Sequence, residues 1–217
     1  SLKEYVDRMP EGQDKIYYAA GESVARIESL PQTEQVKDKG YEILYCTEDV
    51  DDFVMKALEE QDGKKFKSVN DDDALPQSDE EKKAAEEKAE AGKAVLDAVK
   101  EALGDEVKAV RASSILKSAA CCLSADGPVS LEMERYMRKM EKYMSKLEGG
   151  EKMKADRVLE LNLDSAPYAA LKQAQEAGDT DKVARYAKLL YGQAELMAGL
   201  PLADPAEYAR LVSELMV

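Results

Sequence analysis

Ile16-Tyr17-Tyr18-Ala19-Ala20 and Tyr41-Glu42-Ile43-Leu44-Tyr45-Cys46 are two short runs rich in strand-forming residues, and a stretch with helical periodicity follows each. After the first run, Ser23 is placed to cap a helix over residues 24–36, which Pro31 can interrupt. Strands that alternate with helices predict a short parallel sheet joined by right-handed crossovers. We therefore expect a small α/β/α unit at the start of the chain.

Further helices complete this first unit, one before the first run and one over residues 50–58, which Asp62-Gly63 closes. From residue 78 to 92 the chain is almost entirely Glu, Lys and Ala, which predicts a solvated helix rather than a core. A domain boundary is therefore expected near this point. The predicted domains cover residues 1–77 and residues 78–217.

The second domain mixes strands and helices. Two strand-like runs, 107–113 and 119–124, follow the long helix, and their sheet is expected to be antiparallel or mixed. A helix over residues 129–147 comes next, and after a short segment at 158–161 the remainder is helical. The whole chain is thus predicted to be α+β, with a short parallel sheet in its first part.

The last two helices carry more apolar surface than each can bury against the other. A four-helix bundle between two copies of the chain would cover it, and so would an ordinary monomer core. The dimer is our working prediction. Its interface candidates are Val183, Tyr186, Ala187, Leu190, Ala194, Met197, Tyr208, Leu211, Val212 and Leu215.

The helix over residues 129–147 carries a row of methionines on one face and mostly basic residues on the other. Methionine is flexible and polarisable, so such a row suits a surface that accepts many apolar partners. The same row also fits an ordinary core face. From the residues alone both interpretations stay open.

Composition excludes several classes of function. The formal charge of -14 argues against binding to nucleic acid or to anionic membrane, which need a clustered positive field. The absence of histidine removes Ser-His-Asp and Cys-His catalysis and histidine-bearing zinc sites. The three cysteines, with Cys121 and Cys122 adjacent, fit buried positions in a reducing compartment. With no initiator methionine, signal peptide or membrane span, the chain is expected to be a piece of a cytoplasmic protein.

Two local patterns resemble ligand sites but lack the required residues. Gly21-Glu22-Ser23 is a turn before a helix, without the lysine of a phosphate loop or the glycine triplet of a dinucleotide site. Asp71-Asp72-Asp73 lacks the alternating acids, central glycine and distal glutamate of a calcium loop. We therefore predict no catalytic, cofactor-binding or metal-binding residues in this chain.

Several motifs along the chain point to one known family. In order they are Ser1-Leu2-Lys3-Glu4-Tyr5-Val6, Ile16-Tyr17-Tyr18 with Gly21-Glu22-Ser23, the run 41–47, Cys121-Cys122-Leu123, Met133-Glu134-Arg135, Leu159-Glu160-Leu161-Asn162 and Asp204-Pro205. In this order and spacing, the chain resembles the carboxy-terminal half of the heat-shock protein 90 chaperones in their bacterial form.

The resemblance implies that residues 1–77 end the middle domain of such a chaperone and that residues 78–217 form its carboxy-terminal dimerisation domain. It implies that this chain is not an enzyme and holds no cofactor, because the ATP-binding domain lies upstream. The full-length protein would be a stress-response ATPase that uses ATP and magnesium. The implied partners are a second copy of the chain and unfolded or partly folded client proteins. The implied client-binding candidates are Phe53, Val129, Met133, Tyr136, Met137 and Met140.

Two departures qualify the resemblance. Residues 162–167 stand where the family usually shows Asn-Pro, a spacer and His-Pro, and residues 213–217 lack the acidic tail that recruits tetratricopeptide co-chaperones. The missing tail favours a bacterial source. The resulting prediction is the dimerisation and client-binding portion of an ATP-dependent chaperone. The alternative is a helical dimeric scaffold or adaptor with no client surface.

Overall fold

The computed structural model describes residues 1–71, 74–76, 78–144 and 154–216. The chain divides into two compact units. Unit 1 holds residues 1–76 and 128–155, and unit 2 holds residues 77–127 and 156–217. The prediction had kept residues 128–155 in the second domain, whereas their contacts group them with the first. The assignment of chaperone domains to these residues remains a prediction.

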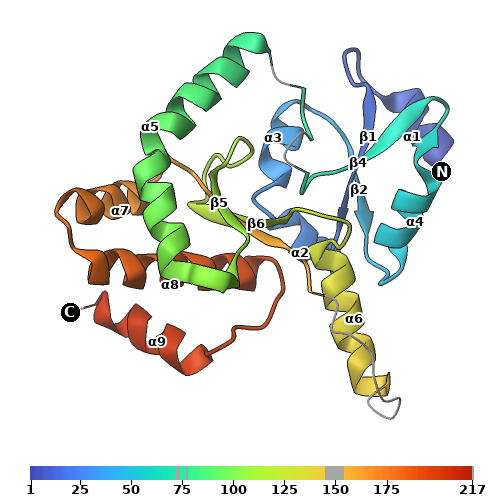
Figure 1. Ribbon diagram of the computed structural model, residues 1–217. Helices are drawn as coiled ribbons and strands as arrows, with labels where there is room; N and C mark the ends of the chain where they lie inside the picture. Colours follow the sequence, from blue (N-terminus) through green and yellow to red (C-terminus); the bar gives the residue numbers. More distant parts are fainter. Residues whose placement is uncertain (72–73, 77, 145–153, 217) are drawn as a thin grey trace. The chain divides into compact units, whose positions relative to one another are not determined.

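Unit 1 is built on a four-stranded sheet in the order β2-β1-β4-β3 (Figure 1). The central strand β1 (Lys15–Ala20) runs parallel to β2 (Ile43–Cys46) on one side and to β4 (Lys64–Ser68) on the other. Its residues are almost all buried, as expected of a parallel strand covered on both faces. The predicted parallel sheet is therefore present.

A hairpin that the sequence analysis missed completes this sheet. The short strand β3 (Glu60–Gln61) pairs antiparallel with β4, and Asp62-Gly63 makes the turn between them. Both turn residues have positive φ, 49° and 74°, the conformation that a two-residue turn of this type requires. We had expected Asp62-Gly63 to end the preceding helix. That helix ends at Leu58, and the dipeptide serves the hairpin instead.

The helices of unit 1 are α1 (Leu2–Arg8), α2 (Val24–Glu28), α3 (Thr33–Asp38), α4 (Asp51–Leu58) and α6 (Leu131–Met144). The predicted helix over 24–36 is interrupted near Pro31 and continues as α3. The predicted end of α6 at Leu147 lies outside the described residues. The core on one face of the sheet contains Tyr17, Ala19, Ile27, Val36, Val69 and Leu75.

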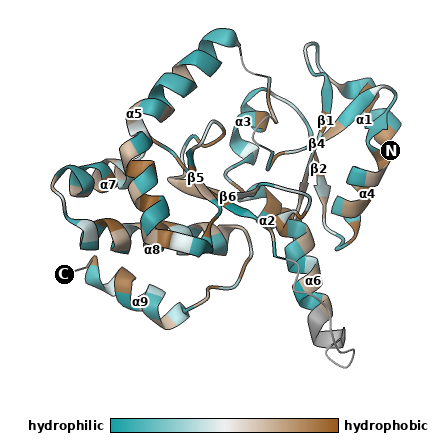
Figure 2. Cartoon of the chain, viewed as in Figure 1, coloured by the Kyte–Doolittle hydropathy of each residue, from teal (hydrophilic) through white to brown (hydrophobic). Residues whose placement is uncertain are grey.

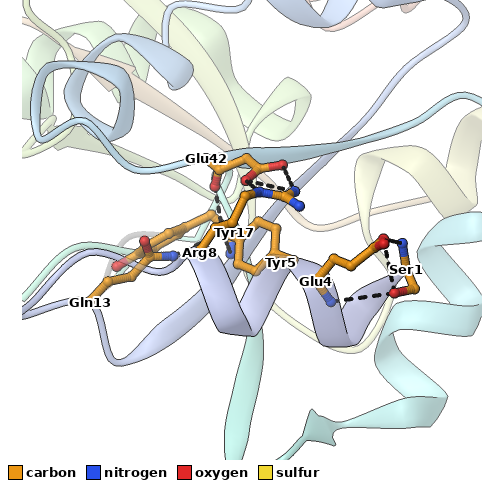
Figure 3. Close-up of polar contacts among 7 residues, drawn as sticks. All are labelled: Ser1, Glu4, Tyr5, Arg8, Gln13, Tyr17 and Glu42. Atoms are coloured by element: carbon orange, nitrogen blue, oxygen red, sulfur yellow. Dashed lines mark hydrogen bonds and ion pairs between the residues drawn. The ribbon is translucent and has the colours of Figure 1, made fainter.

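The hydroxyl of Tyr5 fastens α1 to the sheet (Figure 3). It donates to the backbone oxygen of Glu42 at 2.5 Å and accepts from the backbone N–H of Tyr17 at 3.1 Å and from Gln13 at 2.9 Å. On the surface, Arg8 forms a two-pronged ion pair with the Glu42 carboxylate. Tyr5 itself is 1% exposed, so its hydroxyl makes these hydrogen bonds from a buried position.

Unit 2 packs its helices around a three-stranded sheet in the order β5-β7-β6. The central strand β7 (Arg157–Leu161) is parallel to β5 (Ala109–Ala112) and antiparallel to β6 (Cys121–Ala125). The sheet is mixed, in agreement with the prediction. Its central strand is the segment at 158–161 to which the sequence analysis gave no role.

The helices of unit 2 are α5 (Asp79–Leu103), α7 (Ala166–Glu176), α8 (Thr180–Met197) and α9 (Pro205–Glu214), with a 3-10 turn over Gly104–Glu106. Figure 2 shows α5 hydrophilic in its first half and increasingly hydrophobic in its second. Its buried residues accordingly begin at Gly92 and continue through Val95, Leu96, Val99 and Leu103. The solvated start of this helix was predicted from composition.

No helix in the described part of the chain is long and apolar enough to cross a membrane. The helices and sheets described above confirm the mixed α+β class. The dimeric four-helix bundle requires a second copy of the chain, and it stays a prediction.

Candidate protein-interaction surfaces

The predicted client-binding residues gather on two helices of unit 1. Phe53 lies on α4, Val129 lies just before α6, and the other four lie on α6; we call these six residues the α4–α6 surface. All six are half-buried rather than enclosed. The rings of Phe53 and Tyr136 meet edge to face with their centroids 5.5 Å apart, which joins the two helices into one apolar area.

The buried side of α6 does not coincide with its methionine row. Among residues 131–140 of this helix, the enclosed ones are Leu131 and Glu134, which are 5% and 1% exposed. The Glu134 carboxylate is held there by the backbone N–H of Ala155 at 3.1 Å and by Arg138 at 3.0 Å. Met133, Met137 and Met140 remain partly accessible. This placement favours the surface interpretation of the row over the core interpretation.

An exposed apolar row, which begins at the residue before α4 and continues along that helix, adjoins this surface and was not among the predicted site residues. Val50, Val54 and Leu58 are 52%, 42% and 46% exposed. They recur every four residues, so they share one side of the helix. The spacing was visible in the sequence, but the same spacing is typical of a core-facing stripe.

A buried carboxylate ties α4 to the start of α6. Asp52, which is 4% exposed, accepts from the Ser130 hydroxyl at 2.9 Å and from the Tyr18 hydroxyl at 3.3 Å, and it pairs with Lys56 at 3.0 Å. Burial is the main cause that raises the pKa of Tyr18, with the charge of Asp52 adding to it. The hydroxyl of Tyr18 therefore stays protonated and can donate. Sequence reasoning gave no role to Asp52 or Ser130, which are far apart in the chain.

A second carboxylate, that of Glu132, lies beside the first, and its side chain is 13% exposed. It accepts from the Asn70 amide at 2.8 Å and lies 3.8 Å from Arg135. Burial raises the pKa of Glu132, Asp52 raises it further, and Arg135 opposes the shift. Lys139 adds an exposed pair to Asp49 at 2.7 Å. These contacts fix the start of α6 relative to α4, so the apolar side chains between them are presented in a set orientation.

The predicted dimer residues divide into two groups in unit 2. Val183, Ala187, Leu190, Ala194 and Leu211 are at most 4% exposed, because they pack within their own unit. They are enclosed by their own unit in this single chain, and their place in a dimer contact stays a prediction. Tyr186, Met197, Tyr208 and Val212 are half-buried, and Leu215 is 58% exposed. Together with Leu196 and Met216, 44% and 79% exposed, they form what we call the α8–α9 surface.

Helix α9 packs closely against α8. A Cβ atom added to Gly192 would lie 2.6 Å from the ring of Tyr208, so this approach requires glycine. Lys188 pairs with Glu207 at 2.8 Å across the same two helices. Between them and the end of α5 lies a cavity of about 200 Å³, lined in part by Leu103, Tyr191 and Leu211.

A buried ion pair lies beside this cavity, and sequence reasoning did not find it. Arg157 of the central strand pairs with Glu195 at 2.8 Å and donates to the Tyr191 hydroxyl at 2.7 Å. Burial raises the pKa of Glu195, while Arg157 lowers it. A buried pair of this kind fixes the helix in register, whereas removing one partner would leave an isolated charge.

Two of the three thiols, those of Cys46 and Cys121, are poor nucleophiles in this structure. Burial raises the pKa of Cys46 and of Cys121 to about 12, so both stay protonated at neutral pH. Among the described residues, no group of three or more acidic or cysteine side chains is arranged to hold a metal ion.

Comparison with known proteins gives a consistent result along the whole chain. The family described as "Hsp90 protein" matches residues 1–217. The "Chaperone protein HtpG" of Bacillus velezensis is 46% identical over 217 residues, and that of Clostridium perfringens is 48% identical over 216 residues. Each alignment covers 100% of this chain and 33% of the relative. The chain thus spans about a third of the length of the curated relatives it matches.

The comparisons correct two predictions, the exclusion of enzymatic activity and the exclusion of a cofactor from this chain. Both exclusions depended on placing the family's ATP-binding region outside residues 1–217. The match to the family runs over the whole chain and a third of each relative, so it does not leave the ATPase region outside this chain. The two exclusions are therefore wrong.

The two kinds of comparison agree with the motifs. The family match leaves no residue of the chain uncovered, and relatives that share nearly half of its residues bear the name of chaperones. The chain therefore belongs to the HSP90 family of chaperones.

Proposed function

We propose that this chain is the dimerising and client-holding portion of an ATP-dependent HSP90 chaperone. The observation that carries the proposal is the α4–α6 surface, in which half-buried apolar side chains of two helices meet through the contact of Phe53 with Tyr136. In this proposal, residues 1–77 end the middle domain of the chaperone, and residues 78–217 form the domain that joins two protomers.

The chemistry of the α4–α6 surface suits binding to unfolded chains. Methionine side chains adapt their shape to different apolar partners and contribute dispersion contacts without demanding a fixed geometry. Because Asp52, Ser130 and Glu132 hold the helices in place, the surface needs little reordering when a client binds. A client segment would therefore contact flexible methionine side chains that are carried by two helices held in fixed positions.

The α8–α9 surface supplies the proposed dimer contact. Leu196, Leu215 and Met216 are large apolar residues left exposed on or just after the last two helices. Covering them with the same surface of a second copy gives a symmetric contact, as expected for a homodimer. Joining two protomers in this way would raise the effective concentration of every other domain of the chaperone.

Charge reversal on each surface separates the two roles. We expect Met137→Glu to weaken binding of a reduced and alkylated, permanently unfolded protein, because it places a charge within the apolar contact. Fluorescence anisotropy of the labelled unfolded protein measures this, and sedimentation of the same sample reports the dimer. Met216→Glu is the matched control, and it is expected to keep binding to the unfolded protein and to weaken the dimer. If either variant lost both properties equally, the separation of roles would be wrong.

The scaffold alternative makes a different prediction for the same helix. If the methionine row were part of the core, Met133→Ser would lower the free energy of unfolding by about 2–5 kcal/mol, because it would leave a cavity and bury a hydroxyl group. If the row is a binding surface, the cost is about 1 kcal/mol or less. Urea unfolding of the variant distinguishes the two functions.

A further inference from the structure

The exposed row Val50, Val54 and Leu58 extends the apolar area of unit 1 along α4. The row and Phe53 lie on neighbouring sides of one helix, and Phe53 joins that helix to Tyr136. The residues around this row are strongly acidic. From Thr47 to Gly63 the chain carries seven acidic residues and a single lysine.

Most of these charges are not neutralised within the protein. Lys56 pairs with the buried Asp52, and Lys139 pairs with Asp49. Across the described residues, Glu48, Asp51 and Glu59 have no cation within ion-pair distance, although Asp51 accepts from the backbone N–H of Glu48. Glu48 and Asp51 border the start of the row, and Glu59 borders its end. The apolar row is thus framed at both ends by negative charge.

We propose that this part of unit 1 selects client segments in which apolar side chains are flanked by lysine or arginine. This inference rests on the proposed function and names the class of client that the same site prefers. The apolar side chains of the segment would lie on Val50, Val54 and Leu58, and its flanking cations would lie near Glu48, Asp51 and Glu59. Complementary charge of this kind speeds association and disfavours partners of like charge.

The charge of the chain argues against a second copy as the occupant of this row. The chain has a formal charge of -14, so a second copy would bring mostly like charge toward the acidic border. A basic apolar segment is instead attracted at both ends. Segments of this composition become exposed when a folded protein opens, because natural sequences place charged residues beside unavoidable hydrophobic strands.

Three peptides that differ only in their flanks test the inference. Each has the same apolar centre of four residues, a fluorescein label and two flanking residues on either side, which are Lys, Ser or Glu. Anisotropy titrations with the whole 217-residue chain at low salt give the three affinities. We expect the Lys-flanked peptide to bind about tenfold more tightly than the Glu-flanked one, and the ratio to shrink as salt is added.

Two triple variants assign the preference to this border. Replacing Glu48→Gln, Asp51→Asn and Glu59→Gln together is expected to bring the Lys-to-Glu affinity ratio close to one. The matched control Glu86→Gln, Glu87→Gln and Glu90→Gln removes the same charge from the exposed start of α5 and is expected to keep the ratio. A ratio that fell equally in both variants would reflect overall charge and would overturn the assignment.

The Ser-flanked peptide keeps the inference separate from the proposed function. If it binds and Val54→Ser weakens it, but the three flanks bind alike, the charge preference is wrong and the client surface stands. If Val54→Ser has no effect while the Lys-flanked peptide still binds, attraction is purely electrostatic and the inference is wrong. If none of the peptides binds, both the inference and the proposed client surface fail.

Discussion

At the scale of single residues, one tyrosine hydroxyl satisfies groups from three parts of unit 1. We expect Tyr5→Phe to lower the free energy of unfolding by about 1–3 kcal/mol, because it leaves the backbone oxygen of Glu42 and the N–H of Tyr17 without this partner. Urea unfolding measures the loss. Tyr41→Phe is the control: the ring of Tyr41 stacks on that of Tyr17 with centroids 5.7 Å apart, and the residue is partly exposed. An equal loss in both variants would contradict the assignment to the Tyr5 hydrogen bonds.

We expect the largely enclosed carboxylate of Glu132 to make stability depend on pH. Its pKa is raised in the folded state from its ordinary value of 4.5, chiefly by burial. The folded state therefore holds this proton more tightly, and the stabilisation it gives is complete below pH 4.5 and is lost as pH rises through the folded pKa. We expect Glu132→Gln to remove this loss, while the amide oxygen can still accept from Asn70.

Unfolding of Glu132→Gln and of the unmodified chain, measured from pH 4 to pH 8, tests this expectation. Subtraction cancels the titration of other groups, although Asp52 and Arg135 lie close enough to couple with Glu132. The stability of the unmodified chain should fall relative to the variant as pH rises. A difference of the opposite sign would mean that the charge of Arg135 lowers the pKa of Glu132 by more than burial raises it.

At the scale of elements, two glycines test two different constraints. Gly63 has φ +74° and open space around it, so Gly63→Ala should cost about 1 kcal/mol through backbone strain alone. The loss should appear as reduced stability of unit 1. Hydrogen exchange of β3 and β4 measures the loosening of the hairpin. Unchanged exchange in this hairpin would show that the turn tolerates a side chain.

The second glycine tests the packing of α9. Gly192→Ala places a methyl group against the ring of Tyr208, and we expect overpacking to cost about 1–3 kcal/mol. Helix α9 should then exchange its amide hydrogens faster and the dimer should weaken, because part of the α8–α9 surface moves. Gln193→Ala, at the neighbouring exposed position, is the control and should change neither property. Equal effects from the two variants would mean that the close contact between Gly192 and Tyr208 is not the cause of the change.

At the scale of the whole molecule, the proposed dimer depends on the last helix. We expect sedimentation of the chain across a dilution series to show a dimer, and a truncation before Asp204 to yield a monomer, because it removes α9 and its exposed apolar residues. A stable dimer of this kind usually buries on the order of 2,000 Å². A monomer at every concentration would leave the α8–α9 surface without its proposed role.

The amino-acid sequence by itself determined the strands β1 and β2, the alternation that makes their sheet parallel, the solvated start of α5 and the motifs that indicate the family. These features depend on local periodicity and on residues read in order, so no distant partner is needed to infer them. Tertiary structure decided which apolar stripes become core. Ala187 and Leu190 pack within their own unit, whereas Met133, Met137 and Met140 of α6 stay partly accessible. Both stripes have the same helical spacing, and only packing against residues far away in the chain determines which one is buried.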